Sequence, residues 1–550
     1  MQSECDLLVI GSGAAGLSAA VTAAHGGLRV IVAEKDAVLG GTSAWSGGWI
    51  WAPGNPVCAA AGTSDSAEAA ETYLRAVLGT RFDAARVQAF LTHAPRMVAF
   101  FQSQTALAFE PGSQIPDTYG HLPGAGTGGR SVIAAPYDGR ALGPLIRLLR
   151  RPLRETTFWG LTIQAGPDLR AFMTMTRDLR AFAHVARRMT RHLWDLARHG
   201  RAMQLRNGQA LIARLIRSAA DLGVEFRPNS PAVRLLTEAE RVVGAVLATG
   251  SGEVTIRARR GVVLASGGFP HDLPQRSLAV PTATGDGRHL AGAVGARQGR
   301  TDSPGAWCPV SVVRWPDGRE APFPHISERG KPGLIAVLAN GQRFCNEGLG
   351  YHDFVTALLE ATPPGQPPVA WLIATRAFQR RYGLGISRPF PVPLRPWLRS
   401  GYLASGPTPE ALAAACGIDP AGLRATLDGW NRHAATGDDP AFHRGTTPYM
   451  RLQGDAAHRH NPCVAPIDRP PYLAVKVIPG SFGTFAGLET DAAARVLRDG
   501  SPIPGLFAVG ADTASVMGGF YPAGGINLGP ALTFGHIAGL HAADRLEPAP

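Results

Sequence analysis

A short apolar run, Asp6 to Ile10, stands near the start of the chain and is followed at once by Gly11-Ser-Gly13-Ala-Ala-Gly16. Such a run predicts a buried parallel strand, and Leu17 to Ala24 has the pattern of a helix. Arg29 to Ala33 predicts a second strand, which Glu34 closes. A strand, a G-x-G-x-x-G turn, a helix, a strand and an acid in this order are the fingerprint of a Rossmann-like α/β domain that binds a dinucleotide.

The residues of the fingerprint have separate physical roles. Gly11 allows the tight turn, Gly13 lets a pyrophosphate approach the backbone, and Gly16 lets the helix pack closely. Glu34 is suited to accept hydrogen bonds from ribose hydroxyls. The contacts expected from this unit are Gly11, Gly13, Ala14, Ala15, Gly16, Glu34 and Lys35.

Two further stretches indicate which dinucleotide is bound. Gly40-Gly-Thr-Ser43 and Ser46-Gly-Gly48 form a small-residue loop where the phosphates and ribityl chain of a flavin would run, and a nicotinamide enzyme has no need of it. Leu506 to Asp512 predicts a strand that delivers an acid to a loop. FAD is therefore the expected cofactor. Its further expected contacts are Gly41, Thr42, Ser43, Ser46, Gly47, Gly48, Val233, Ala265, Gly267, Gly510 and Asp512.

The stretch Val516 to Gly535 sets Tyr521 against a run of glycines that opens an apolar helix. A glycine-rich helix start presents unpaired N–H groups and the positive end of the helix dipole. Both attract the electron-rich edge of an isoalloxazine or a substrate carbonyl. We expect Gly525, Asn527 and Leu528 to contact the flavin, and the tyrosine beside them indicates chemistry as well as binding.

Composition and charge narrow the class of protein. With 550 residues and 45% hydrophobic content the chain can bury a large core, and two domains are the default. Its net charge of +12 is carried almost wholly by arginine, as GC-rich coding produces, and we expect no nucleic-acid partner. The six cysteines lack metal-site or haem spacing. No secretory signal or apolar run of ~20 residues is evident, which predicts a cytoplasmic protein.

The organisation along the chain predicts an interrupted FAD-binding domain. Its first part is expected at residues 1–289, an inserted α+β catalytic domain at 290–478, and its second part at 479–550. Within the first part, Gln209 to Gly223 predicts a helix, and three stretches alternate like antiparallel strands, namely Val224 to Leu236, Val242 to Thr249 and Glu253 to Val263. Helices are also expected at Pro409 to Ala415 and Ala421 to Ala434.

Residues 140–207 form an arginine-rich helical insertion. Apolar side chains recur there at three- and four-residue steps, namely Leu179, Phe182, Val185, Met189, Leu193 and Leu196. Such a stripe is more often a packed face than a membrane anchor, although a basic amphipathic helix also suits a membrane surface. We expect a packed face, with peripheral contact to the inner membrane as the alternative.

Four motifs together resemble the fumarate reductase/succinate dehydrogenase flavoprotein superfamily over essentially the whole chain. They are Gly11 to Gly16, Gly40 to Ser43, Asn340 to Glu347 and the Tyr521 loop. Within the superfamily the sequence is most similar to 3-ketosteroid Δ1-dehydrogenases. The resemblance implies a fold of the fumarate reductase flavoprotein type.

The dicarboxylate reductases of this superfamily clamp two carboxylates with cations, and this chain departs from them at those positions. Gly348-Leu-Gly-Tyr351 stands where they place an arginine, Gly480 to Gly487 lacks their histidine, and Leu528 follows Asn527 in place of another arginine. An unpartnered buried carboxylate costs several kcal/mol, so fumarate and succinate are poor candidates. The Gly40-Gly-Thr-Ser43 loop has no histidine for covalent attachment, which implies non-covalent FAD.

The resemblance to ketosteroid dehydrogenases instead assigns roles to tyrosines. The Tyr521 hydroxyl and the Gly525 N–H would polarise a ketone oxygen, although Ala523-Gly524 replaces the usual Gly-Pro. Tyr351 matches the base on the α-carbon, and Tyr119 matches the tyrosine that hydrogen-bonds that base. Such a bond and a nearby flavin would lower the pKa of the base, which is otherwise near 10. His121, His352 and Asp353 are rival acid–base groups that we expect to be structural.

The resulting hypothesis is an FAD-dependent 3-ketosteroid Δ1-dehydrogenase acting on an apolar ketone, with an electron acceptor that the sequence does not identify. A Δ4-(5α)-ketosteroid or small cyclic ketone dehydrogenase is the alternative, since the same acid–base logic serves all of them. The Δ4 group places a serine where this chain has Ala523. A membrane-surface flavoprotein that relays electrons is the alternative from another class.

Overall fold

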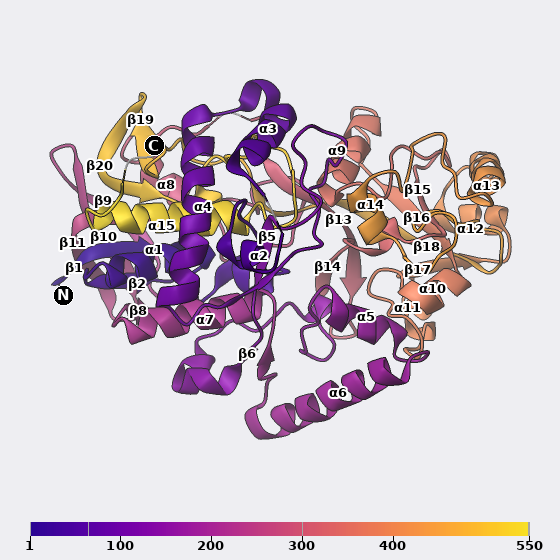
Figure 1. Cartoon of the computed structure of the whole chain (residues 1–550), viewed down its shortest axis with the longest axis horizontal. Coiled ribbons are helices and arrows are strands. Elements are labelled where there is room, and N and C mark those ends of the chain that lie inside the picture. Colours follow the sequence, from indigo (N-terminus) through magenta and orange to yellow (C-terminus); the bar gives the residue numbers. More distant parts are fainter. Residues whose placement is uncertain (1, 64, 300, 548–550) are drawn as a thin grey trace.

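Two large β-sheets organise the protein. The computed structural model describes residues 2–63, 65–299 and 301–547. Figure 1 shows the first sheet and both chain ends at one end of the long axis, and the second sheet at the other. The chain therefore runs out to the second sheet and returns to the first.

The first sheet is built around β1 (Gln2–Ile10). β1 pairs in parallel with β2 (Val30–Ala33) on one side and β11 (Gly252–Leu264) on the other. β20 (Ser501–Ala508) pairs in parallel with β11. The strand order is β19-β20-β11-β1-β2-β8, with β8 at Glu225–Arg227 and β19 at Arg495–Arg498. The expected discontinuous Rossmann-like sheet is thus present, completed by strands from both ends of the sequence.

An antiparallel hairpin extends this sheet. β9 (Ala232–Glu238) pairs with β10 (Arg241–Thr249), and β10 pairs with the first half of β11. The strand predicted over Val224 to Leu236 is two strands, β8 and β9, because the chain turns between them. Pro228 has no N–H to donate, and Asn229 has a φ of +52°. β8 lies parallel to β2 and not antiparallel as predicted.

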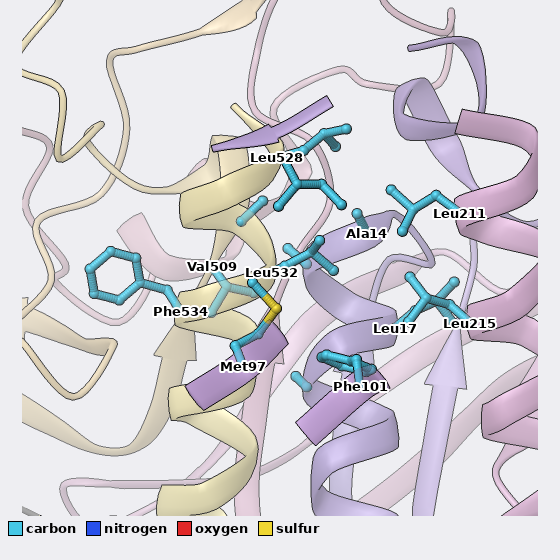
Figure 2. Packing of buried hydrophobic residues seen from close by; sticks show 14 of the residues in the cluster. Ala14, Leu17, Met97, Phe101, Leu211, Leu215, Val509, Leu528, Leu532 and Phe534 are labelled. Atoms are coloured by element: carbon cyan, nitrogen blue, oxygen red, sulfur yellow. The ribbon is translucent and has the colours of Figure 1, made fainter. Parts of the chain in front are cut away.

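Two helices, α1 (Ala14–His25) and α15 (Leu528–Ala542), pack on the first sheet, and α4 (Ala84–Gln104) and α7 (Gly208–Asp221) pack on α15 and α1. Figure 2 shows apolar side chains from all four in one packed cluster, with Leu17 of α1 beside Leu215 of α7. α1 and α15 run in the same direction and touch through glycine, since a Cβ on Gly535 would lie 2.4 Å from Ala15 O. This crossing brings the Gly11–Gly16 turn and the Tyr521 loop to the same edge.

The second sheet has the order β14-β13-β18-β16-β15 and is antiparallel except for β12, which pairs with β18 in parallel. Its long strands are β13 (Gly305–Arg314) and β18 (Tyr472–Thr484). Its other strands are β12 (Arg276–Ser277), β14 (Glu320–Pro324), β15 (Leu334–Val337), β16 (Ala370–Thr375) and β17 (Leu403–Gly406). β12 and the last residues of β18 lie outside residues 290–478, the range expected for the catalytic domain. Tyr351 begins α9 (Tyr351–Ala361), which packs on this sheet.

The helical insertion differs from the expected packed face. In α6 (Leu179–His199) the buried side chains include Arg188 and Asp195, which form ion pairs with Asp168 and Arg140. The apolar stripe points outward instead: Leu179 is 86% exposed, Phe182 53%, Leu193 52% and the neighbouring Trp194 66%. Of the stripe only Val185 is buried, so the prediction of a packed face is wrong for most of it.

The remaining elements are short connections. The further helices are α2 (Pro56–Ala60), α3 (Ala67–Leu78), α5 (Pro167–Thr174), α8 (Asp286–Gly292), α10 (Arg376–Tyr382), α11 (Arg395–Arg399), α12 (Pro409–Cys416), α13 (Pro420–Ala434) and α14 (Pro448–Gln453). The minor strands are β3 (Trp49–Trp51), β4 (Phe109–Pro111), β5 (Ser131–Ala134), β6 (Tyr137–Asp138) and β7 (Gln204–Leu205). Within the described ranges no helix is long and apolar enough to span a membrane.

Candidate active site

A cavity of about 1840 Å³ is lined by residues of the first sheet, the second sheet and the helical insertion. Small-molecule sites usually enclose roughly 300–1,000 Å³. The cavity therefore has room for a dinucleotide and a second ligand together.

The glycine turn after β1 forms one wall of this cavity. Gly11, Gly13, Ala14 and Ala15 line it. Gly11 has a φ of +107°, and a Cβ there would lie 2.2 Å from Ala265 O. Gly16 lies behind the wall, where a Cβ would lie 2.1 Å from Gly11 O, so it has the expected packing role. The start of α1 thus faces the cavity with bare backbone, as a phosphate site requires.

Glu34 and Lys35 line the same wall at the end of β2. The Glu34 carboxylate accepts hydrogen bonds from the Ser12 hydroxyl and, at 3.1 Å, from the Ser12 N–H. Lys35 Nζ lies 2.9 Å from Asp286 Oδ2 and donates to Thr284 Oγ1 at 2.6 Å. Both side chains are therefore held in place by the protein itself.

The small-residue loop after Glu34 forms a second wall. Gly41, Thr42, Ser43, Ser46, Gly47 and Gly48 all line the cavity. Ser43 Oγ accepts a hydrogen bond from Ala14 N at 3.1 Å, which ties this loop to the start of α1. Thr42 Oγ1 accepts one from Val280 N at 3.1 Å. The loop and the glycine turn therefore form one cradle.

Two of the expected contacts lie elsewhere. Val233 is not among the described residues that line the cavity, and its side chain is 47% exposed; Ala232, one residue earlier, lines it. Successive side chains of a strand point to opposite faces, which explains the error of one residue. Asp512 is buried, and its carboxylate accepts hydrogen bonds from Ser266 Oγ and Gly268 N, both at 2.9 Å. It fixes the turn after β11, whereas Gly510, Ala265 and Gly267 do line the cavity.

The C-terminal loop lines the cavity through Tyr521, Gly525, Asn527 and Leu528. Gly525 has a φ of +104°, and its carbonyl accepts a hydrogen bond from Trp51 N at 3.1 Å, which docks the loop on β3. Asn527 Nδ2 donates to the Tyr521 hydroxyl oxygen at 3.1 Å. The proton of the Tyr521 hydroxyl is therefore available for another acceptor.

Tyr351 and Tyr521 meet in this cavity, and both line it. Their ring centroids lie 4.8 Å apart, and the Phe482 ring lies 5.4 Å from that of Tyr351. Burial, with a contribution from Tyr521, holds the pKa of Tyr351 well above its usual range. Burial also raises the pKa of Tyr521. Within the protein itself the shift at Tyr351 is thus opposite to the lowering that we expected, and both hydroxyls keep their protons at neutral pH.

We expected the Tyr119 hydroxyl to form a hydrogen bond with Tyr351, but its partner is another residue. It donates to Asp353 Oδ1 at 2.7 Å. Tyr119 is not among the described residues that line the cavity, and neither is Asp353. Burial raises the pKa of Asp353 to about 6. Asp353 lies in the first turn of α9, two residues after Tyr351, so a buried carboxyl that titrates near neutrality stands close behind the candidate base.

The two histidines named as rivals have structural settings. His352 is buried, and its Nδ1 accepts a hydrogen bond from Trp307 N at 3.2 Å. Burial lowers the pKa of His352 to about 4, so the ring is neutral. His121 is exposed. Asp353 remains as the rival group that the structure makes chemically relevant.

Two residues that line the cavity, and one that lies behind Tyr351, belong to no sequence motif. Tyr449, at the start of α14, lines the cavity, and burial raises its pKa to about 12. Arg388 also lines it. Asp353 was visible in sequence only as a neighbour of Tyr351. None of the three belongs to a local motif, because each is placed by contacts between distant segments.

The described lining suits a bound dinucleotide. Bare backbone lines it at Gly11, Gly13 and Gly41, and an added Cβ on Gly47 would meet no atom within 4 Å. No histidine is among the described residues that line the cavity, which supports the expectation of non-covalent binding. Residues 6–528 match the family described as FAD binding domain. The chain belongs to this FAD-binding family. FAD is its cofactor.

Several relatives match almost the full length. The chain is 40% identical to 4-oxocyclohex-2-ene-1-carboxylate 5-dehydrogenase of Sinomonas cyclohexanicum, over 98% of this chain and 94% of that protein. It is 35% identical to 3-oxosteroid 1-dehydrogenase of Mycobacterium tuberculosis, over 98% and 99%. The crystal structure of 3-ketosteroid Δ1-dehydrogenase from Sterolibacterium denitrificans with 1,4-androstadiene-3,17-dione is similar at a TM-score of 0.91 and 35% identity, covering 98% of this chain and 100% of that one.

These similarities confirm the family and fold inferred from the motifs. The protein is an FAD-dependent oxidoreductase with the fold of the ketosteroid dehydrogenases. The relatives named above act on ring ketones of two very different sizes, and the choice between them depends on the cavity of this chain.

Proposed function

We propose that the protein introduces a carbon–carbon double bond next to the carbonyl of a ring ketone. The observation that carries this proposal is the meeting of Tyr351 and Tyr521, with rings 4.8 Å apart, in the cavity that the glycine cradle also lines. Two tyrosine hydroxyls supply an acid and a base without any metal ligand set. Among the described residues no cluster of three or more histidine, cysteine or carboxylate side chains is placed to hold a metal.

Tyr521 polarises the ketone oxygen in this proposal. Its oxygen accepts a hydrogen bond from Asn527 Nδ2 at 3.1 Å, which leaves its own O–H free to donate. The Gly525 N–H is the second donor. Two donors fixed before the reaction stabilise the charge that develops on the oxygen as the α-proton leaves, which is the action of an oxyanion hole.

Tyr351 removes the α-proton. Its raised pKa means that the hydroxyl is protonated at rest, so Tyr351 acts from the fraction that has already lost its proton to solvent, and that phenolate is a strong base. Asp353 lies two residues along the first turn of α9, and its Oδ1 accepts a hydrogen bond from the Tyr119 hydroxyl. We assign Tyr119 and Asp353 to positioning the start of α9 behind Tyr351. FAD bound in the glycine cradle would supply the two-electron oxidant that the reaction needs for the hydride of the β-carbon.

A 3-ketosteroid is the substrate class that we favour, with 1,2-desaturation as the reaction. The cavity has room for a second ligand beside a dinucleotide, and the apolar side chains Leu278, Phe482 and Phe323 in its lining support an apolar ring system. A small cyclic ketone is the second candidate, since a relative that is 40% identical is named for a carboxylated cyclohexenone.

Anaerobic mixing of the oxidised holoenzyme with a panel of ketones tests this proposal. We expect steroid or monocyclic ring ketones to bleach the visible flavin absorbance, and fumarate and succinate to leave it unchanged. Bleaching by none of the ring ketones would reject the function. The panel also orders the two substrate classes by rate.

We further propose that the outward face of α6 contacts an anionic lipid surface. Leu179, Phe182, Leu193 and Trp194 are more than half exposed along one helix, and Arg180, Arg187 and Arg198 are exposed on the same helix. An apolar face bordered by basic side chains is the pattern of an interfacial helix. Each basic residue near an anionic surface contributes about 1 kcal/mol.

Flotation with vesicles of phosphatidylglycerol or of phosphatidylcholine tests this contact. We expect the holoenzyme to bind the anionic vesicles, and Leu193→Ser with Trp194→Ser to abolish binding. Phe390→Ser is the matched control, because Phe390 is 50% exposed but lies outside the insertion. Equal binding of both variants would reject the proposal, and so would self-association through α6 without vesicle binding.

A further inference from the structure

Arg388 is a cationic residue that lines the cavity and belongs to none of the segments of the glycine cradle. It lies in the loop after α10 (Arg376–Tyr382), and its Nη2 donates to Thr157 O at 2.9 Å and to Glu155 O at 3.2 Å. Both acceptors are neutral carbonyls. In the part of the chain that the structure describes, no salt bridge includes Arg388.

This setting differs from that of two other arginines near the same segments. Arg381, which also lines the cavity, forms an ion pair with Asp455 at 2.6 Å. Arg319, which is not among the described lining residues, forms an ion pair with the Glu155 carboxylate at 2.8 Å. Arg388 is half-buried, and burial lowers its pKa with no carboxylate to offset the effect. A partly desolvated cation without an anion is costly, so such groups usually have one when the protein works.

The remaining donors of Arg388 are free for a ligand. A guanidinium has five N–H groups in a planar fork, and both of these hydrogen bonds use Nη2. Nε and Nη1 remain. The two carbonyls hold one arm of the fork in place, and a fixed fork favours a carboxylate over other acceptors.

Arg388 is connected to the tyrosines through adjoining strands of one wall. Tyr351 packs against the cluster that contains Val310, and Val310 of β13 pairs with Pro324 of β14. Phe323, Pro324 and Ile326 line the cavity. His325, between Pro324 and Ile326, lies against the loop that carries Arg388: a Cβ added to Gly385 of that loop would be 3.1 Å from His325 Cε1. An apolar stretch thus separates the proton-handling end from the cation.

We propose that Arg388 binds a carboxylate on the substrate, at the end of the molecule remote from the ketone. The substrate class is therefore an anionic ring ketone: either a monocyclic oxo-acid or a steroid whose side chain ends in a carboxylate. This inference rests on the proposed dehydrogenase function and adds the recognition of charge to it.

Matched pairs of substrates test this inference on the holoenzyme. One pair is 4-oxocyclohexanecarboxylate and its methyl ester, and the other is a 3-oxosteroid with a carboxylate side chain and its methyl ester. In the wild type we expect the acid of one pair to have a lower KM than its ester. The pair that shows this difference identifies whether the carboxylate belongs to a monocyclic ketone or to a steroid. Equal KM values for acid and ester in both pairs would overturn the inference.

Variants of Arg388 separate charge recognition from folding. Arg388→Met should raise the KM for the preferred acid by ~10- to 100-fold, because a charge-assisted hydrogen-bonded pair is lost. The KM for the ester should not change. Arg388→Lys keeps the charge and should recover part of the loss. Arg380→Met is the control, because Arg380 is exposed and stacks on Phe390 outside the cavity. An equal effect on acid and ester would overturn the inference.

A binding measurement keeps this result distinct from the proposed activity. Cyclohexanecarboxylate has no ketone and cannot be dehydrogenated by this chemistry. We expect it to perturb the flavin spectrum of the wild type on binding and to do so only at ~10-fold or higher concentration in Arg388→Met. If no ketone reduces the flavin but this binding difference holds, only the dehydrogenase function fails. If ketones reduce the flavin and the difference is absent, only the anion site fails.

Discussion

The ring of Tyr351 meets the ring of Tyr521 edge-on, with centroids 4.8 Å apart and planes at 71°. Tyr351 begins α9 on the second sheet, and Tyr521 belongs to the loop that leads back to α15 on the first sheet. The pair therefore exists only when both parts of the fold are in place. Because both rings line the cavity, a ketone between the hydroxyls would lie next to the glycine cradle that suits FAD.

Replacing Tyr351 tests the assignment of the base. Tyr351→Phe keeps the ring that packs on Tyr521 and Phe482 and removes only the hydroxyl. We expect the rate of flavin reduction by a ring ketone to fall by ~10²- to 10⁴-fold, as for the loss of a general base, with FAD still bound. Rapid mixing measures the rate, and the flavin spectrum reports occupancy. A variant with unaltered reduction would assign the base to another group.

Replacing Tyr521 tests the polarising role. Tyr521→Phe should lower kcat/KM by ~10²- to 10³-fold, the usual cost of one oxyanion donor. Tyr402→Phe is the matched control, since Tyr402 donates or accepts a hydrogen bond with Ser311 at 2.6 Å and is not among the described residues that line the cavity. Steady-state kinetics on both variants compare them. A similar loss in the control would indicate that Tyr521 matters for packing alone.

The pH dependence follows from the pKa shifts. Tyr351 acts after losing its proton, and its pKa lies above the usual range, so kcat/KM should rise with pH across the neutral and alkaline range. Asp353, with a pKa of about 6, should add an acid limb near that value. Asp353→Asn should remove this limb and leave the alkaline rise. An unchanged profile in the variant would confine Asp353 to a structural role.

Asp353 also has a consequence for stability. Its pKa rises from the usual 3.8 of an unfolded chain to about 6 in the fold because of burial. A raised carboxyl pKa means that the fold binds the proton more tightly, so its contribution to stability is present below pH ~4 and is lost as the pH rises through about 6. The free energy of unfolding of Asp353→Asn should therefore change less between these pH values than that of the wild type. Urea titrations at several pH values measure this.

The segment before Tyr351 is held by a buried ion network. Glu347 is fully buried, and its carboxylate lies 2.7 Å from Arg343 Nη2 and 3.2 Å from Arg444 Nη1. Glu347→Gln leaves a buried cation short of its partner and should lower the free energy of unfolding by ~3–5 kcal/mol. Urea unfolding tests this value. Glu410→Gln is the control: its ion pair with Arg424 is exposed, so its removal should hardly change stability.

The same network has a defined pH dependence. Burial alone would raise the pKa of Glu347, but Arg343 and Arg444 hold it below its usual range. A lowered carboxyl pKa contributes stability above the pKa of the unfolded chain, near 4.5, and that contribution is lost as the pH falls. The difference in stability between wild type and Glu347→Gln should therefore shrink in acid.

Local motifs predicted the nucleotide-binding part of the fold well. The Gly11–Gly16 turn, the Gly40–Ser43 loop and β20 carry their signals within a few residues, because turn geometry and strand burial are local properties. Pairings between distant segments had no such signal. Tyr119 contacts Asp353, 234 residues away, and not Tyr351. The Asp512 carboxylate accepts hydrogen bonds from Ser266 and Gly268, and no local sequence pattern reveals this contact.

The insertion illustrates a second limit of sequence patterns. Periodicity identified the apolar stripe of α6, but it did not indicate which face of this helix packs against the rest of the protein. Arg188 and Asp195 are drawn inward by ion pairs with Asp168 and Arg140, which lie outside the helix. These pairings turn the apolar stripe outward. Arg388 is a similar case, since only the tertiary fold brings it to the cavity wall.

The most direct test of this account is anaerobic rapid mixing of the oxidised holoenzyme with ring ketones, comparing wild type with Tyr351→Phe. We expect a 3-oxosteroid or a carboxylated cyclohexanone to bleach the wild-type flavin and deuterium on the α-carbon to slow the bleaching. The flavin of Tyr351→Phe should bleach at least ~10²-fold more slowly, with the FAD retained. A wild-type flavin that no ring ketone reduces, or a variant that is reduced as fast as the wild type, would contradict it.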